Sequence, residues 1–330
     1  MQAKLVAVRR PPICSIPLTK LEWGAVDGSH RKRHRNEQHQ STNDARRPQQ
    51  GGITENQTRE VIRIVEKVVV AEPKTVMGVP PLVDDRVRYV VNFILEHVNS
   101  ANVEIEAKFG TLIEKSSHVR VINCVPVLCE TPISYEANKD TYFKSEVGND
   151  IFAMLNSKLN ARVEATEQSS SRVQYLHTQE MDVYWPGKVR ETKVRRNTAD
   201  GSEHYETIRI QSKKRLGDLN VLCPNKYADI RYSASREQDC SIPPNSKPQR
   251  CRIKDRISYK YEYLSIDITC VEMQGEATAD NTNSFEVEVE IDPSANLYEE
   301  VLKYRRQDEA SKLFDIACSL VNTVRLLLEE

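Results

Sequence analysis

Polar and apolar residues alternate with a period of two along most of the chain after Asn99. Because successive side chains of a β-strand point to opposite faces, this period predicts strands that each have one polar and one apolar face. The predicted strands cover the segments 103–109, 119–127, 173–184, 188–195, 204–215, 229–237, 252–261, 264–271 and 284–291.

Apolar residues at helical spacing flank these strands. They predict helices over 61–69, 87–98, 150–159 and 313–328, with Asp84 as the N-cap of the second. The segment 61–69 is rich in β-branched residues, so a strand remains an alternative there. Many antiparallel strands flanked by helices indicate an α+β fold with a closed antiparallel β-barrel.

Charge divides the chain into a basic start and an acidic remainder. Residues 1–50 hold ten Lys and Arg against four Asp and Glu, whereas the remaining 280 residues hold 37 against 44. Residues 1–55 contain the cluster 31–35 and few large apolar residues, so we expect a disordered basic tail. The cluster is either a nuclear import signal or a solvated basic linker. We expect a linker with one helix over 56–82 and the folded domain over 83–330.

Several classes of protein are disfavoured. No apolar run approaches the ~20 residues that span a bilayer, which argues against a membrane protein. The eight cysteines are scattered without a CxxC pair, which argues against a zinc site and for reduced thiols. The sequence has no GxxxxGK[ST] loop of a P-loop NTPase and no motif for nucleophilic catalysis by Ser or Cys.

Two predicted strands carry glutamates at every second position. Glu104 and Glu106 share a face of the first, with Lys108, and Glu286, Glu288 and Glu290 share a face of the last. Glutamate is a poor strand former, and like charges two residues apart on a strand repel. Each strand alone could be an ordinary half-exposed strand, but a bound Mg²⁺ or Mn²⁺ explains both together.

Other predicted strands carry cations on one face. These residues are Lys188 and Arg190; Arg209, Lys213 and Arg215; Arg231; and Arg252, Lys254, Arg256 and Lys260. Lys and Arg side chains bind phosphate oxygens. We expect all polar faces to point into the barrel and the apolar faces to point out, toward the helices. The interior is then a hydrated tunnel with an acidic and a basic wall, suited to a metal and a polyphosphate. The alternative is a sandwich that exposes these faces to solvent.

Three segments resemble the signature strands of the fungal RNA 5′-triphosphatases, the beta subunits of the mRNA capping enzyme and members of the triphosphate tunnel metalloenzymes. The segments are 103–110, 252–259 and 285–290, and the resemblance extends over about residues 80–330. It implies an eight-stranded antiparallel tunnel that removes the γ-phosphate of triphosphate-ended RNA with Mg²⁺ or Mn²⁺, the first step of cap formation.

The resemblance also implies residue roles. Metal ligands would be Glu104, Glu106, Glu286 and Glu288, with Glu290 beside them. Phosphate-binding residues would be Arg190, Lys213, Lys254 and Arg256, and the tunnel wall would include Arg231, Arg252 and Asp267, the last bracing basic side chains. Glu237 would orient the attacking water.

The resemblance implies action in the nucleus on nascent pre-mRNA, with an mRNA guanylyltransferase and a second copy of the chain as partners. The Trp-containing segment by which budding-yeast members bind the guanylyltransferase has no clear copy, since Trp23 lies in a different sequence. That partner is therefore left open. Two functions remain as alternatives: a tunnel phosphatase acting on free NTP or tripolyphosphate, and a non-catalytic module that binds RNA ends.

Overall fold

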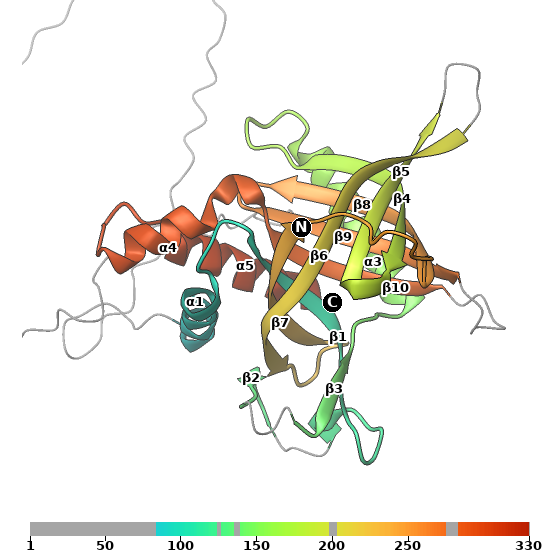
Figure 1. Ribbon diagram of the computed structural model, residues 1–330. Coiled ribbons are helices and arrows are strands. Elements are labelled where there is room, and N and C mark those ends of the chain that lie inside the picture. The colour runs from blue at the N-terminus through green and yellow to red at the C-terminus, as the bar shows by residue number, and fades with distance from the viewer. Residues whose placement is uncertain (1–83, 124–126, 135–138, 198–202, 275–282, 330) are drawn as a thin grey trace, which may run out of the picture. The chain divides into compact units, whose positions relative to one another are not determined.

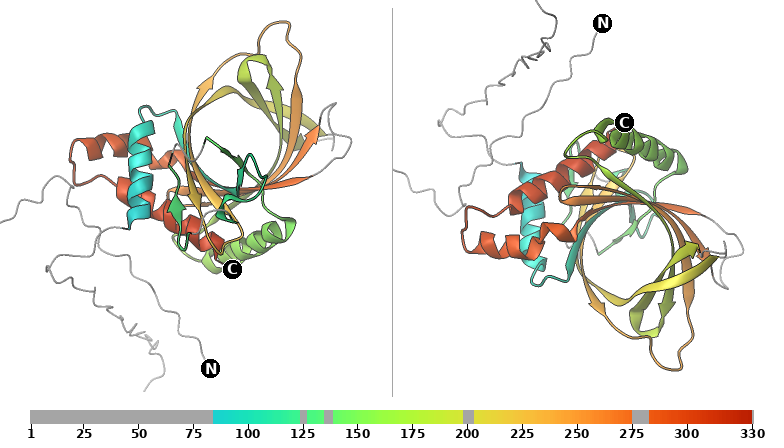
Figure 2. Two further views of the ribbon diagram at one scale, coloured as in Figure 1. Left: turned by 90° about the horizontal axis from the view of Figure 1, so that it is seen from below. Right: turned by 90° about the horizontal axis from the view of Figure 1, so that it is seen from above.

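The computed structural model describes residues 84–123, 127–134, 139–197, 203–274 and 283–329. Our expectations for 1–55 and 56–82, including the helix over 61–69, lie outside these residues. Eight of the described strands form a closed antiparallel ring (Figures 1 and 2). In ring order they are β1 (Val103–Glu114), β7 (Asp229–Asp239), β6 (Glu203–Leu222), β5 (Val189–Asn197), β4 (Gln174–Trp185), β8 (Arg250–Tyr261), β9 (Leu264–Gln274) and β10 (Ser284–Ile291).

The pairing of β10 with β1 closes the barrel. Glu106 lies opposite Glu290, and Lys108 opposite Glu288. On the other side of β1, Glu106 lies opposite Ser233 of β7. The predicted eight-stranded closed barrel is therefore confirmed, and each of the eight ring strands matches a segment predicted from the alternation.

Helices cover one side of the barrel (Figure 2). They are α1 (Asp85–His97), α3 (Asn149–Thr166), α4 (Leu297–Arg305) and α5 (Leu313–Leu328). Asp84 caps α1 as predicted, because its Oδ1 accepts from Arg86 N at 3.0 Å. Ile105 and Phe109 of β1, Val289 of β10 and Ile316 of α5 belong to one fully buried core between the barrel and the helices. The apolar faces of these strands thus point outward, as expected.

On the barrel's other side, part of the outward face stays exposed. Ile208 of β6 is 48% exposed and Tyr175 of β4 is 48% exposed. The expectation that apolar faces pack against helices therefore holds for β1, β7 and β10 but not around the whole ring.

The predicted strand over 119–127 is wrong in its described part. Val121–Asn123 is a short 3₁₀-helix, η1, and Arg120 makes only an isolated bridge to Ile113. Val121 packs with Leu112 and Leu222 in a small apolar cluster at one end of the barrel and does not belong to a sheet. Two short strands were not predicted: β2 (Thr131–Pro132), which pairs with β6, and β3 (Thr141–Lys144), which pairs with β1.

Candidate functional site

The interior of the barrel is a cavity of about 500 Å³ lined almost entirely by charged and polar side chains. Eleven of the thirteen predicted site residues line it: Glu104, Glu106, Glu237, Glu286, Glu288, Glu290, Arg190, Lys213, Arg252, Lys254 and Arg256. The polar faces of the strands thus point inward, and the sandwich alternative is wrong. Closing the ring brings residues more than 180 positions apart in the chain to one site.

Glu106 lies at the centre of the acidic wall. Its side chain is 4% exposed, and its Oε2 lies 3.1 Å from Lys108 Nζ and 3.5 Å from Lys213 Nζ. Its Oε1 is buried and has no hydrogen-bond partner among the described residues. Burial raises the pKa of Glu106, although Lys108 opposes the shift. The guanidinium of Arg215 lies 3.9 Å from Oε1, within ion-pair distance but beyond hydrogen-bond range, so this oxygen still lacks a hydrogen-bond donor.

The two neighbouring glutamates of β10 differ in their surroundings. Burial opposes ionisation of Glu288, but Lys108 and Arg256 outweigh it and lower its pKa. Lys108 Nζ also forms an ion pair with Glu288 Oε1. For Glu290, burial together with Glu104 and Asp267 raises the pKa well above its usual value. The two carboxyl groups therefore differ in environment: cations dominate around Glu288, whereas burial and other carboxylates dominate around Glu290.

Lys213 of β6 fills part of this space. Its Nζ lies 3.0 Å from Glu104 Oε1 and 3.8 Å from Glu237 Oε1. Burial disfavours the ammonium, but Glu106 and Glu104 outweigh it and raise the pKa of Lys213. Across the described part of the chain, no three His, Cys, Asp or Glu side chains already surround one point as metal ligands. The carboxylates face the space that the lysine ammonium groups occupy.

Glu237 lies between two cations. Arg190 Nη2 of β5 donates to Glu237 Oε1 at 3.0 Å, and Lys213 approaches the same oxygen. Both pairs use Oε1, so among the described residues the second carboxylate oxygen of Glu237 forms no ion pair, and other donors of the guanidinium remain available. A carboxylate held by two cations beside a cavity can orient a water molecule without moving.

Three cations of the basic wall, all on β8, are each paired with a carboxylate. Arg256 Nη1 donates to Asp267 Oδ2 at 2.9 Å, and Arg252 Nη2 donates to Glu286 Oε1 at 2.7 Å. Lys254, which is 6% exposed, forms an ion pair with Asp182 Oδ2. Because each cation has a fixed partner, its position on the wall is defined before any substrate binds.

The strand β4 supplies two acidic residues that the sequence interpretation missed. Asp182 is fully buried; its Oδ1 accepts from Thr192 Oγ1 at 2.7 Å, and Glu180 Oε2 lies 4.0 Å from Arg256 Nε. Although burial opposes ionisation, Lys254 lowers the pKa of Asp182. Glu180 and Asp182 are two residues apart, the same spacing that singled out Glu104 and Glu106, so a signal was present in the sequence.

Two predicted residues lie away from the lining of the cavity. Asp267 is 6% exposed and contacts the site through Arg256, which fits the bracing role that the resemblance implies. Arg231 lies closer to β3: its Nε donates to Asn220 Oδ1 at 2.7 Å, and its guanidinium lies 4.6 Å from the ring centroid of Phe143. Burial lowers the pKa of Arg231. Its predicted contact with substrate stays untested.

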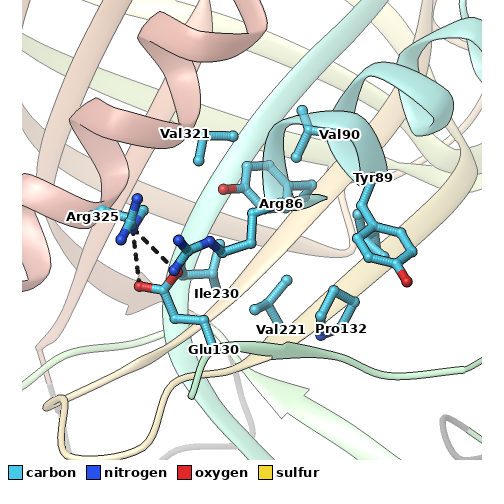
Figure 3. Close-up of a pocket in the computed structure, with 11 residues that line it drawn as sticks. Arg86, Tyr89, Val90, Glu130, Pro132, Val221, Ile230, Val321 and Arg325 are labelled. Atoms are coloured by element: carbon cyan, nitrogen blue, oxygen red, sulfur yellow. Dashed lines mark hydrogen bonds and ion pairs between the residues drawn. The ribbon is translucent and has the colours of Figure 1, made fainter. Parts of the chain in front are cut away.

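A second pocket lies outside the barrel, between α1, α5 and β2 (Figure 3). Its volume is only about 10 Å³. Glu130 accepts from Arg86 Nη1 at 2.9 Å and from Arg325 Nε at 3.2 Å, so it joins the two helices to the segment before β2. The pocket is too small for a substrate, and its ion pairs act in packing.

Comparison with known proteins gives consistent matches. The family model for "mRNA capping enzyme, beta chain" matches residues 81–330. The mRNA-capping enzyme subunit beta of Schizosaccharomyces pombe is 31% identical over 79% of this chain and 87% of its own length. That of Cryptococcus neoformans is 30% identical over 72% of this chain, but this chain spans only 60% of it. No helix in the described ranges is long and apolar enough to cross a membrane.

Solved structures agree with the sequence matches. The S. pombe Pct1 RNA triphosphatase covers 79% of this chain with a TM-score of 0.68 and 30% identity, and this chain covers 99% of that structure. A structure of Pct1 in complex with the Spt5 CTD matches with a TM-score of 0.69 and 29% identity over 80% of this chain and 99% of its own. Because the family model matches most of the chain and a relative of this family is 31% identical over 79% of it, the chain belongs to the family of mRNA capping enzyme beta chains.

Proposed function

We propose that this protein is a metal-dependent RNA 5′-triphosphatase that removes the γ-phosphate from the 5′ end of nascent pre-mRNA, the first step of cap formation. The observation that carries the proposal is Glu237, which Arg190 and Lys213 hold inside a cavity with an acidic and a basic wall. This is the apparatus that in-line phosphoryl transfer to water needs: positioned cations, a site for a divalent ion and a carboxylate that orients the nucleophile.

The residues of the acidic wall fit a divalent cation. Glu106 has a buried oxygen without a hydrogen-bond donor among the described residues, and the pKa of Glu290 is raised by burial and by neighbouring carboxylates. Carboxylate oxygens are the ligands that Mg²⁺ and Mn²⁺ prefer. The resemblance implied Glu104, Glu106, Glu286 and Glu288 as ligands, with Glu290 beside them. Because Glu290 lies opposite Glu106, whereas Glu286 and Glu288 form ion pairs with Arg252 and Lys108, we instead assign the ion to Glu104, Glu106 and Glu290, with Glu286 and Glu288 beside them. When bound, the ion would supply positive charge to the phosphate oxygens.

The basic wall would bind the β- and γ-phosphates through donors that its carboxylates do not use. Guanidinium carries five N–H donors and ammonium three, so the pairing of Arg256 with Asp267 and of Lys254 with Asp182 leaves donors for phosphate. With Arg190 and Lys213, these groups would stabilise the charge on the equatorial oxygens of the transferred phosphoryl group.

Glu237 would position the attacking water and accept its proton. Its Oε1 is held by Arg190 at 3.0 Å, so Oε2 is the oxygen available to a water molecule. The strands that carry Glu237 and Arg190 are both hydrogen-bonded to β6, which fixes the distance between the two backbones. The products would be diphosphate-ended RNA and inorganic phosphate.

The deciding experiment measures release of labelled phosphate from γ-labelled triphosphate-ended RNA by the full chain. We expect turnover with Mg²⁺ or Mn²⁺ and a loss of at least about 100-fold in rate when EDTA removes the cation, because several kcal/mol of charge stabilisation is lost. Restoring either cation should restore the rate. Undiminished turnover in EDTA would contradict the role given to the acidic wall.

Two other functions make different predictions in the same assay. A phosphatase for free NTP or tripolyphosphate would hydrolyse those substrates with a kcat/KM at least equal to that for RNA. A non-catalytic module that binds RNA ends would release no phosphate with any of them. Retention of Glu237 beside the glutamates favours catalysis over binding alone.

We also propose that the protein acts in the nucleus beside an mRNA guanylyltransferase, and that residues 31–35 direct import. A chain that begins at Asn56 should keep full triphosphatase activity, because every residue that lines the cavity lies between Glu104 and Glu290, but it should lose nuclear accumulation. Fluorescence imaging of the tagged full and shortened chains measures this. A full-length chain in which only the basic residues of 31–35 are neutralised separates their effect from that of the rest of the tail. It should lose nuclear accumulation to the same extent as the shortened chain.

A homodimer is proposed as the working assembly. Leu326 of α5 is 65% exposed and Tyr89 of α1 is 52% exposed, and the two helices are in contact. Apolar side chains exposed on adjacent helices favour burial against a partner. Light scattering after size exclusion should give twice the mass of the chain; a monomer at every concentration would contradict the proposal.

A further inference from the structure

The cations on the cavity face of β8 have carboxylate partners along most of the strand, but the cation at its start has an aromatic partner instead. Arg256, Lys254 and Arg252 each form an ion pair with a carboxylate. Arg250, the next cavity-lining cation of the strand, has no carboxylate partner in the described ranges and lies instead with its guanidinium carbon 4.3 Å from the ring centroid of Tyr184. The donors of Arg250 are therefore available at this end of the cavity.

Tyr184 is fixed at the same end by its neighbours. It lies opposite Arg190 of β5 and opposite Arg250 of β8, and its carbonyl oxygen accepts from Gln249 N at 2.7 Å. The ring lines the cavity, and Arg250 is exposed to solvent. The pair therefore presents an aromatic ring and a guanidinium plane at the mouth of the tunnel, two positions along the strand from Asp182 and Arg252.

The hairpin between β4 and β5 adds a third group. Gly187 has a φ of 78° and Lys188 a φ of 63°. A positive φ is unfavourable for a lysine, so the short turn that imposes it has to be stabilised elsewhere. Lys188 lines the cavity and, within the described part of the chain, forms no ion pair with a carboxylate. Tyr184, Arg250 and Lys188 are hereafter the mouth residues.

We propose that the mouth residues form the binding site for the first nucleotide of the RNA. The base would stack against Tyr184 and Arg250, and the phosphodiester that follows would contact the charge of Lys188. Stacking of bases on aromatic rings and guanidinium planes is tolerant of sequence, as a site that receives every transcript requires.

The distribution of charge along the tunnel indicates in which direction the RNA strand runs through it. Glu104 and Glu290 belong to the part of the tunnel where β1 begins and β10 ends, which is where the proposed cation and the γ-phosphate would be held. Unpaired positive charge lies at the mouth residues. The γ-phosphate would therefore lie towards Glu237 and the RNA would leave past Tyr184. This inference rests on the proposed triphosphatase function and adds how the enzyme distinguishes RNA from bare polyphosphate.

The test compares kcat/KM for triphosphate-ended RNA with that for inorganic tripolyphosphate, which has no base. Tyr184→Leu and Arg250→Ala should each lower the ratio of the two values about tenfold, through a higher KM for RNA. Tyr184→Phe keeps the ring and is the matched control, with a ratio within about twofold of the wild type. Melting curves identify any variant that fails to fold, and Lys188→Gln provides an independent variant outside both strands.

Two results would overturn the inference. An unchanged ratio in Tyr184→Leu and Arg250→Ala would mean that no base binds there. Equal losses with both substrates would mean that Tyr184 acts on the phosphates through Arg252, with which its side chain forms a hydrogen bond. If the wild type hydrolyses neither substrate, the proposed function fails, and equilibrium binding of RNA and tripolyphosphate to the same variants then decides the subsite: a wild-type binding ratio in the variants would reject it.

Discussion

Glu106→Gln is expected to lower phosphate release at least about 100-fold while leaving the barrel folded. The substitution keeps the size of a side chain that is 4% exposed but removes the charge that lies between Lys108 and Lys213. Loss of one carboxylate from a site for a divalent cation should remove several kcal/mol of transition-state stabilisation. Single-turnover phosphate release at saturating Mn²⁺, together with a melting curve, measures both parts of the expectation.

Glu114→Gln is the matched control for this result. Glu114 is on the same strand, but it accepts from Ser117 Oγ at 2.6 Å near the exposed end and does not line the cavity. It should keep wild-type turnover. Glu104→Gln and Glu290→Gln should behave like Glu106→Gln, and near wild-type rates in any two of the three would remove the proposed cation site.

The closed barrel could be predicted because its pattern is repeated and strong. In β10, apolar residues alternate with Glu286 and Glu288. The apolar face, with Val287 and Val289, packs in the core, and the glutamate face lines the hydrated tunnel. The strand predicted over 119–127 is wrong in its described part because the pattern there is short and is not repeated. Its apolar residues cover one end of the barrel without a partner strand, and periodicity alone cannot distinguish such a cover from a strand.

The sequence predicts the site as an acidic wall and a basic wall, but it does not predict which acidic and basic residues form ion pairs. From the sequence, Arg252, Lys254 and Arg256 form a face of mutually repelling cations. In the structure, each has an acidic partner from another strand, and Asp182, the partner of Lys254, is more than seventy residues earlier in the chain. Which strands face each other across the tunnel depends on the ring order, which alternation does not contain. The spacing of Glu180 and Asp182 was visible, but they were not singled out beside the glutamate-rich strands.

Asp229→Ala is expected to lower the free energy of unfolding by about 3–5 kcal/mol, the largest stability effect we anticipate. Asp229 is 1% exposed and accepts from Leu112 N, Cys223 N and both Nε and Nη2 of Arg120, at 2.7–3.1 Å. Its removal leaves two backbone donors without an acceptor at the end of the barrel where β6, β7 and β1 meet. It also leaves the guanidinium of Arg120 without its carboxylate, with only the carbonyl oxygens of Lys226 and Cys223 as acceptors.

Thermal unfolding of Asp229→Ala measures this, with an expected loss of about 10 °C in Tm. Arg88→Ala is the control, because its ion pair with Asp85 joins two exposed side chains and should contribute little. Arg120→Ala should lose less than Asp229→Ala, since it leaves the carboxylate with its two backbone donors. Because Asp229 does not line the cavity, the activity per folded molecule should survive at a temperature below the transition. A Tm equal to that of Arg88→Ala would mean that β6, β7 and β1 are held together there without this carboxylate.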